Sequence, residues 1–228
     1  MDKQMINTPG AEALVQPRSR RDFFKTLAVA GAGAAVGSTV LSRKAFAQSG
    51  TSDADIGNFA LTLEYLEADF YTKAVDSGVL SGNALAIVTA LRDHEVAHVD
   101  AITKFLQAAG ATPVAKPAFT FPSDAFSSTD SILKLAATFE PVGVGAYLGQ
   151  APLIQSPDLL AAAGSIVGVE DEHVVAINSL FGNVVGVLEP FPAALSKDEV
   201  LKAVAPFLGM SQMPNTGGSS GSGPFRAI

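Results

Sequence analysis

Residues 91–102 read LRDHEVAHVDAI, and residues 166–177 read IVGVEDEHVVAI. Each stretch contains a glutamate followed three residues later by a histidine, and apolar residues continue around this motif at helical spacing. Residues three apart lie on one face of an α-helix, with Cβ atoms about 5–6 Å apart. A carboxylate on an inward face is costly unless it is paired or bound to a metal. The two stretches therefore predict buried helices with polar groups at their centres: Glu95, His98, Glu170 and His173.

A further glutamate precedes each motif at nearly equal distance. Glu64 lies 31 residues before Glu95, and Glu140 lies 30 residues before Glu170. Such a spacing fits a helix, a turn and a return to the same depth on an antiparallel neighbour. The chain thus consists of two similar halves that together supply four carboxylates and two imidazoles, as in di-iron and di-manganese carboxylate bundles. Four negative charges neutralise two divalent cations, and mixed oxygen and nitrogen ligands suit iron or manganese.

The same periodicity predicts four long helices, over residues 53–76, 82–109, 129–149 and 157–187. Residues 111–128 contain three prolines and form a linker long enough to run the length of a bundle. One long crossover between the second and third helices is the connectivity of ferritin-like bundles, so we expect an all-α four-helix domain over residues 48–209. Residues 196–208 predict a short fifth helix, and residues 210–228 a flexible Gly/Ser-rich tail.

Pro141 conflicts with the third helix, because proline lacks an N–H and its ring clashes inside a helix. Two alternatives follow: the helix starts at Glu140, or it bends there.

Several residues near the motifs allow two interpretations. Glu67 competes with Glu64 for the inward position, and it can also hydrogen-bond a ligand histidine. His94 lies beside the apolar stripe, as a surface residue or as an outer partner of the site. Tyr71 and Tyr147 are more often core aromatics with a satisfied hydroxyl than redox groups. The structural alternative for the whole cluster is a buried polar layer that is held by salt bridges and binds no metal.

Residues 1–47 predict an export signal. They carry seven Lys/Arg against three Asp/Glu, and SRRDFFK at residues 19–25 precedes a weakly apolar run and the small-residue site Ala45-Phe46-Ala47. Paired arginines of this kind resemble the twin-arginine signal, so we expect cleavage after Ala47 and a periplasmic or extracytoplasmic location. An uncleaved anchor is the alternative, although the apolar run is too short and too weak for a good membrane span.

Composition excludes several classes of function. The remaining residues carry eight Lys/Arg against nineteen Asp/Glu, which argues against binding to nucleic acid. The chain has no cysteine, which excludes disulfides, zinc ribbons and thiolate-held clusters. We expect no stable membrane span after removal of the signal, and an oligomer is possible.

The chain resembles the ferritin-like superfamily, and within it an exported branch related to plant desiccation-associated proteins. The resemblance rests on LTLEYLE at residues 61–67, FEPVGVGAY at residues 139–147 and EDEH at residues 170–173. It implies Glu64 and Glu140 as terminal ligands, Glu95 and Glu170 as bridging carboxylates, and one histidine on each metal. It also implies that Tyr71, seven residues after Glu64, lies near the centre.

Three functions remain open at this point. The first is a di-iron protein that reacts with oxygen or peroxide or oxidises ferrous iron, using an external reductant. The second is a manganese catalase-like activity on the same ligands. The third is a non-enzymatic exported stress or desiccation protein whose metal site is structural or vestigial.

Overall fold

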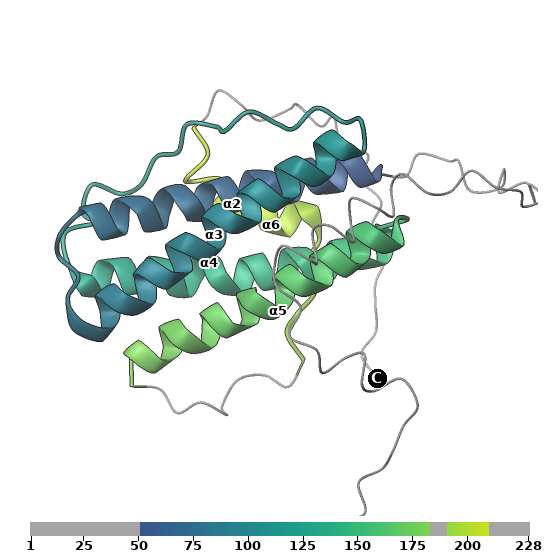
Figure 1. Cartoon of the computed structure of the whole chain (residues 1–228). Coiled ribbons are helices and arrows are strands. Elements are labelled where there is room, and N and C mark those ends of the chain that lie inside the picture. The colour runs from purple at the N-terminus through teal and green to yellow at the C-terminus, as the bar shows by residue number, and fades with distance from the viewer. Residues whose placement is uncertain (1–50, 183–190, 210–228) are drawn as a thin grey trace, which may run out of the picture. The chain divides into compact units, whose positions relative to one another are not determined.

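The computed structural model describes residues 51–182 and 191–209, and these residues form five α-helices and no strand (Figure 1). The fold is therefore all-α, as predicted. Four long helices are followed by a short one, with one 3-10 turn, η2, at Ala151–Leu153 between the third and fourth. The helices are α2 at Asp53–Asp76, α3 at Gly82–Ala108, α4 at Thr129–Gln150, α5 at Pro157–Leu180 and α6 at Lys197–Val204.

Serine caps begin four of these helices. The side chains of Ser52, Ser128, Ser156 and Ser196 each accept a hydrogen bond from the backbone N–H three residues later. Such a cap satisfies one of the N–H groups that a helix start leaves unpaired, which explains why the helices begin where they do. Gly110, with φ of 75°, follows the end of α3, where the sequence predicts a stop.

Two sequence predictions about helix bounds need correction. The third helix does not start at Glu140, because α4 runs without interruption from Thr129 to Gln150 with Pro141 inside it. Pro141 is exposed, so its ring projects into solvent. The fourth helix does not reach residue 187: α5 ends at Leu180, and Gly182 then adopts φ of 72°. Residues 183–187 of that prediction lie outside the described part of the chain, as do the predicted signal and tail.

The long crossover runs along the bundle from the end of α3 to the start of α4, as Figure 1 shows in teal. The Asn58 side chain on α2 fixes its beginning, donating to the Thr112 carbonyl (3.2 Å) and accepting from the Val114 N–H (2.6 Å). Further along, a β-bridge pairs Phe119 with Leu208, after α6. The segment that follows α6 thus lies alongside the crossover.

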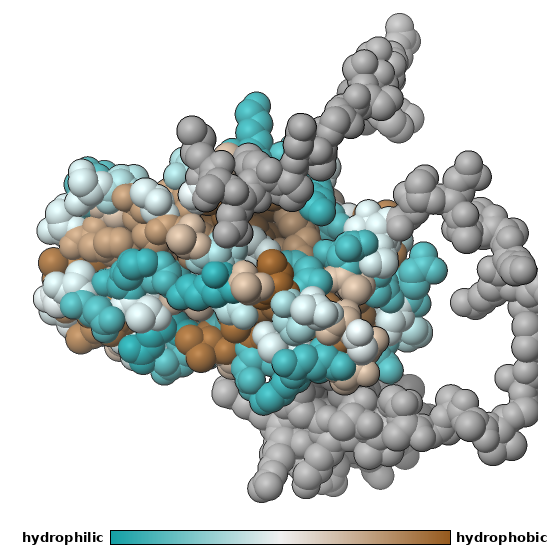
Figure 2. All heavy atoms as spheres, turned by 90° about the horizontal axis from the view of Figure 1, so that it is seen from above, coloured by the Kyte–Doolittle hydropathy of each residue, from teal (hydrophilic) through white to brown (hydrophobic). Residues whose placement is uncertain are grey.

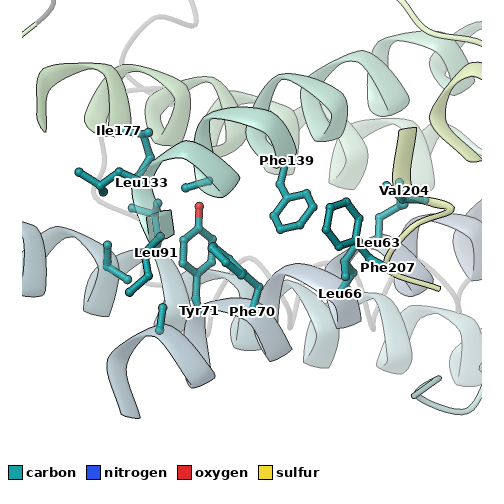
Figure 3. Packing of buried hydrophobic residues seen from close by; sticks show 14 of the residues in the cluster. Leu63, Leu66, Phe70, Tyr71, Leu91, Leu133, Phe139, Ile177, Val204 and Phe207 are labelled. Carbon is teal, nitrogen blue, oxygen red and sulfur yellow. The ribbon is translucent and has the colours of Figure 1, made fainter. Parts of the chain in front are cut away.

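Apolar clusters lie on both sides of the polar motifs. Along α3, Leu91 belongs to a larger apolar cluster and Ile102 to a smaller one, with Glu95 and His98 between them. The larger cluster contains Phe70, Tyr71, Phe139 and Phe207, and Figure 3 shows these rings packed between opposing helices. The Phe139 and Phe207 rings meet edge to face at 4.7 Å between centroids. The polar motifs therefore occupy one layer of an otherwise apolar core.

The outer surface is mixed. Figure 2 shows hydrophilic and hydrophobic residues side by side on the face it displays. In the described residues, no helix combines the length and the hydropathy that a membrane span requires.

Candidate metal centre

Among the residues that the structure describes, seven acidic or histidine side chains are buried at the centre of the four long helices. Each exposes 8% or less of its surface. Helix α2 supplies two glutamates, α4 supplies one, and α3 and α5 each supply a Glu-x-x-His pair. The residues are Glu64, Glu67, Glu95, His98, Glu140, Glu170 and His173.

Six of the seven form two overlapping groups that can hold a metal ion. The first position consists of Glu64, Glu95, His98 and Glu170, and the second of Glu95, Glu140, Glu170 and His173. Within each group, one ligand atom per residue lies within 4.8 Å of all the others. Glu95 and Glu170 belong to both groups, so the two positions share these carboxylates.

The shared carboxylates each direct one oxygen to each position. At the first position, Nδ1 of His98 lies 3.1 Å from Oε1 of Glu170 and 3.3 Å from Oε2 of Glu95. At the second, Nδ1 of His173 lies 3.0 Å from Oε1 of Glu95 and 3.6 Å from Oε2 of Glu170. In each shared carboxylate, one oxygen thus faces His98 and the other faces His173, which is the arrangement of a carboxylate that bridges two ions.

Each terminal carboxylate divides its oxygens between a histidine and a tyrosine. Oε2 of Glu64 lies 3.2 Å from Nδ1 of His98, while its Oε1 accepts a hydrogen bond from the Tyr147 hydroxyl. Oε2 of Glu140 lies 3.3 Å from Nδ1 of His173, and its Oε1 accepts from the Tyr71 hydroxyl. Figure 3 shows Tyr71 extending from α2 with its hydroxyl toward the opposite helix. Each tyrosine thus holds the carboxylate of the other half of the chain.

The donor atoms fit a metal ion better than they fit one another. Within the described residues, five buried atoms of the cluster have no hydrogen bond of good geometry: Glu95 Oε1, Glu140 Oε2, Glu170 Oε1 and Oε2, and His173 Nδ1. Buried polar atoms are normally hydrogen-bonded. These atoms lie close together but converge on a common region instead of pairing, as the ligands of a cation do.

The carboxylates change the protonation of both histidines in the metal-free site. Burial lowers the pKa of His98, but hydrogen bonding to Glu170, Glu64 and Glu95 outweighs it and raises the pKa to about 12. Burial also lowers the pKa of His173, but the surrounding carboxylates outweigh this effect and raise the pKa to about 12. Both rings are therefore imidazolium ions, with a proton on each nitrogen, at neutral pH when no metal is bound.

The glutamates respond in different directions. Burial raises the pKa of Glu140 to about 7, although the close contact with the protonated ring of His173 opposes it. Burial and the charge of Glu170 raise the pKa of Glu95, and burial with the same neighbour raises the pKa of Glu67 well above its usual range. At Glu170, burial is outweighed by the close contacts with the protonated rings of His173 and His98, which lower the pKa to about 2.

The sequence allows two interpretations for each of two residues at the edge of the site, His94 and Glu67. His94 is half-buried, and its Nδ1 lies 3.0 Å from Nε2 of His173 with the two rings nearly parallel, so it is an outer partner of the site. The carboxylate of Glu67 lies beside Gly143, where a Cβ atom would stand 3.3 Å from Oε1 of Glu67 and 3.5 Å from Oε2 of Glu170. The structure places His94 beside His173, and the hydrogen bond from Glu67 to a ligand histidine stays a prediction.

Comparison with known proteins agrees with this architecture. The sequence profile of the ferritin-like domain family matches residues 52–183, more than half of the chain. The chain belongs to the ferritin-like domain family. The matched range includes all four long helices and every residue of the two metal positions.

A solved structure of low sequence identity shares the ferritin-like fold. It is a conserved hypothetical protein from Mycobacterium tuberculosis, 18% identical, with a TM-score of 0.52 over 61% of this chain and 96% of that chain. No curated protein matches the chain in sequence.

The hydrogen bond between Tyr147 and Glu64 is absent from the sequence-based expectations, although the sequence contains a signal for it. Tyr71 follows Glu64 by seven residues, and Tyr147 follows Glu140 by seven. The repeated spacing places both tyrosines two helical turns beyond a terminal carboxylate. The pairing of His94 with His173 has no comparable signal, because it depends on how α3 and α5 face each other.

Proposed function

We propose that this ferritin-like domain binds two iron ions, one at each position, and that the pair reacts with oxygen or peroxide. One observation carries the proposal: two buried groups of four ligands share Glu95 and Glu170. Glu64 and His98 would complete the first position, and Glu140 and His173 the second. Four carboxylates balance the charge of two divalent ions, and oxygen and nitrogen donors of this kind suit iron or manganese.

Two bound ferrous ions would supply two electrons, which cleavage of the peroxide O–O bond to two water molecules consumes together with two protons. The residues of the chain provide the setting. The apolar clusters on both sides exclude bulk water, which strengthens electrostatic interactions inside the site. Tyr71 and Tyr147 hold one oxygen of each terminal carboxylate, leaving the other for the ion. Repeated reaction would need an external reductant.

The experiment begins with metal content. The exported protein, purified and analysed for its elements, is expected to contain close to two iron atoms per chain. The double variant Glu95→Gln/Glu170→Gln keeps the side-chain volumes and should lose both, whereas Glu172→Gln, on the exposed face of α5, should lose neither. Two manganese atoms would identify the alternative metal. A folded protein that binds neither metal would contradict the site and favour the non-enzymatic stress or desiccation role.

The reaction is tested in a single turnover. Ferrous-loaded protein, mixed with peroxide in the absence of oxygen, should oxidise two ferrous ions for each peroxide consumed. Absorption of the ferric product and peroxide consumption measure the ratio. Loaded protein that reacts no faster than ferrous iron in buffer would contradict the redox part of the proposal and leave metal binding intact.

We further propose that residues 1–47 direct export by the twin-arginine route, with cleavage after Ala47. The family match supports this boundary, since it begins at residue 52. Replacing Arg20 and Arg21 by lysine should keep the protein in the cytoplasm with its signal attached, as fractionation and mass measurement would show. Export of that variant at the normal rate would contradict the proposed route.

A further inference from the structure

The site has an internal pseudo-symmetry that relates its two positions. On α2 and α4, an offset of 76 residues relates Glu64 to Glu140 and Tyr71 to Tyr147. On α3 and α5, an offset of 75 relates each Glu-x-x-His pair to the other. The contacts obey the same relation, because each histidine faces one terminal and two shared carboxylates.

Two neighbouring residues break this symmetry. The counterpart of Glu67 under the offset on α2 and α4 is Gly143, and the counterpart of His94 under the offset on α3 and α5 is Val169. At both places, an ionisable side chain in the first half of the chain corresponds to a residue without a polar side chain in the second half. Both differences affect the second position.

His94 acts on the second position through His173. Nδ1 of His173 faces the carboxylates at 3.0–3.6 Å, so this nitrogen is the one available to an ion. The metal-bound neutral ring then carries its proton on Nε2, which lies 3.0 Å from Nδ1 of His94. A partner in that place fixes the tautomer and the ring orientation and makes the ligand nitrogen more basic. For His98, the residue that corresponds to His94 by the offset of 75 is Val169, whose side chain cannot accept a hydrogen bond.

Glu67 acts on the same position through Glu170. Because Gly143 has no side chain, the Glu67 carboxylate can lie beside Oε2 of Glu170, the oxygen that faces His173. A fifth carboxyl group is thus added to the side of the second position. The geometry contains no equivalent addition beside Glu95, since Gly143 occupies the corresponding point in the sequence.

We propose that the two metal positions are unequal and that the second, formed by Glu95, Glu140, Glu170 and His173, takes the first divalent ion. His94 is the main positioning residue for this preference, and Glu67 adds a carboxyl group with further oxygen atoms beside it. The proposal rests on the proposed function, since it requires that the site bind two ions. Loss of an outer hydrogen bond to a ligand histidine lowers metal affinity about 10- to 100-fold, so a preference of at least about tenfold is expected.

The test uses Mn²⁺, which is stable in air. Metal-free protein receives one equivalent, and anomalous diffraction from its crystals locates the ion. Calorimetric titration of the same protein measures both dissociation constants. The expected result is that the ion lies mainly between Glu140 and His173, with two dissociation constants that differ at least about tenfold. An ion located mainly at the first position, or divided equally, overturns the proposal.

Two variants at position 94 form a matched pair. His94→Val copies the residue at position 169 and should reduce the preference at least about tenfold. His94→Asn keeps an acceptor atom near the place of Nδ1 and should retain most of it. A purely structural role of His94 would not distinguish the two. Thermal unfolding of the metal-free variants establishes that both are folded.

The double variant His94→Val/Glu67→Gln removes both differences between the halves. Its two positions should fill evenly, and a preference equal to that of the unchanged protein overturns the proposal. Failure of the proposed function has a different outcome, in which two equivalents of Mn²⁺ leave both positions of the unchanged protein without bound ion.

Discussion

At the scale of single residues, the two tyrosine hydroxyls connect the halves of the site. Tyr71 on α2 donates to Glu140 on α4, and Tyr147 on α4 donates to Glu64 on α2. Both rings are buried, and burial followed by the nearby carboxylates raises the pKa of each hydroxyl well above its usual value. Both hydroxyls therefore stay protonated and act as hydrogen-bond donors at neutral pH.

Tyr147→Phe should loosen the first position and leave the second nearly unchanged. Loss of the hydroxyl leaves a buried carboxylate oxygen of Glu64 without its donor, which costs about 1–3 kcal/mol in the free energy of unfolding. Chemical denaturation of the metal-free protein measures this loss, and metal titration measures the affinity. Tyr71→Phe should affect the second position instead. Tyr65→Phe is the control, since that partly buried tyrosine donates no described hydrogen bond to the cluster. Equal effects of all three variants would contradict the assignment.

Metal binding should release protons and strengthen as pH rises. The pKa of about 12 for His98 and for His173 means that both rings are protonated in the metal-free protein at pH 7. An ion binds only the deprotonated nitrogen, so two ions should displace about two protons from the histidines, with more from Glu140 and Glu95. The apparent affinity must therefore fall as pH decreases. Calorimetry in buffers of different ionisation enthalpy counts the protons, and pH-independent binding would contradict the histidine ligands.

The sequence predicts the residues that come together better than it predicts how they pair. The matched Glu and Glu-x-x-His spacings select the six residues of the two groups, because helical periodicity and chain reversal determine depth in the bundle. That they bind metal stays a prediction. The half-buried position of His94 against His173 depends on the rotation of α3 relative to α5, which local spacing does not determine.

At the scale of elements, the segment before α6 lies against glycines of α4. The Leu195 N–H donates to the Gly145 carbonyl at 2.9 Å, and a Cβ atom on Gly149 would stand 1.8 Å from the Leu195 carbonyl oxygen. That distance is far below van der Waals contact, and the opposing atom is backbone. The glycine is therefore required for the close approach of this segment.

Gly149→Ala should destabilise the domain, although alanine favours helices. The added methyl group forces the segment at Leu195 away from α4. Gly164→Ala on α5 is the matched control, because nothing lies within 4 Å of its Cβ position. Replacing an open helical glycine should raise the free energy of unfolding by roughly 0.5–1 kcal/mol. Thermal and chemical denaturation compare the two, and a stable Gly149→Ala variant would contradict the contact.

Helix bounds follow from sequence where a local signal is strong. The start of α2 at Asp53 agrees with its serine cap, and the end of α3 agrees with the glycine that follows. The predicted end of α5 at residue 187 is too late, because apolar residues continue at helical spacing beyond Leu180, where the helix ends. The continuity of α4 through Pro141 was also open, since a proline on the solvent side is tolerated where neighbouring helices hold the rest of the element.

At the scale of the whole domain, one polar layer interrupts a core that is otherwise apolar. Without metal, its carboxyl and imidazole groups must be buried with incomplete hydrogen bonding, which is costly. With metal, ligands from all four long helices would join in one cluster. Ion binding should therefore stabilise the fold as well as the site.

Metal should raise the unfolding temperature of the entire domain in a single transition. A ligand that binds only the folded state adds about 2.7 kcal/mol at one hundred times its dissociation constant, and two ions add nearly twice that. Calorimetric scans of metal-free protein, of protein with Mn²⁺ and of protein with Mn²⁺ and excess chelator measure the shift and its reversal. Glu140→Gln should retain part of the stabilisation, because the first position keeps all its ligands. An unfolding temperature that does not change when metal is added would show that the buried layer holds the four helices together by its own ion pairs.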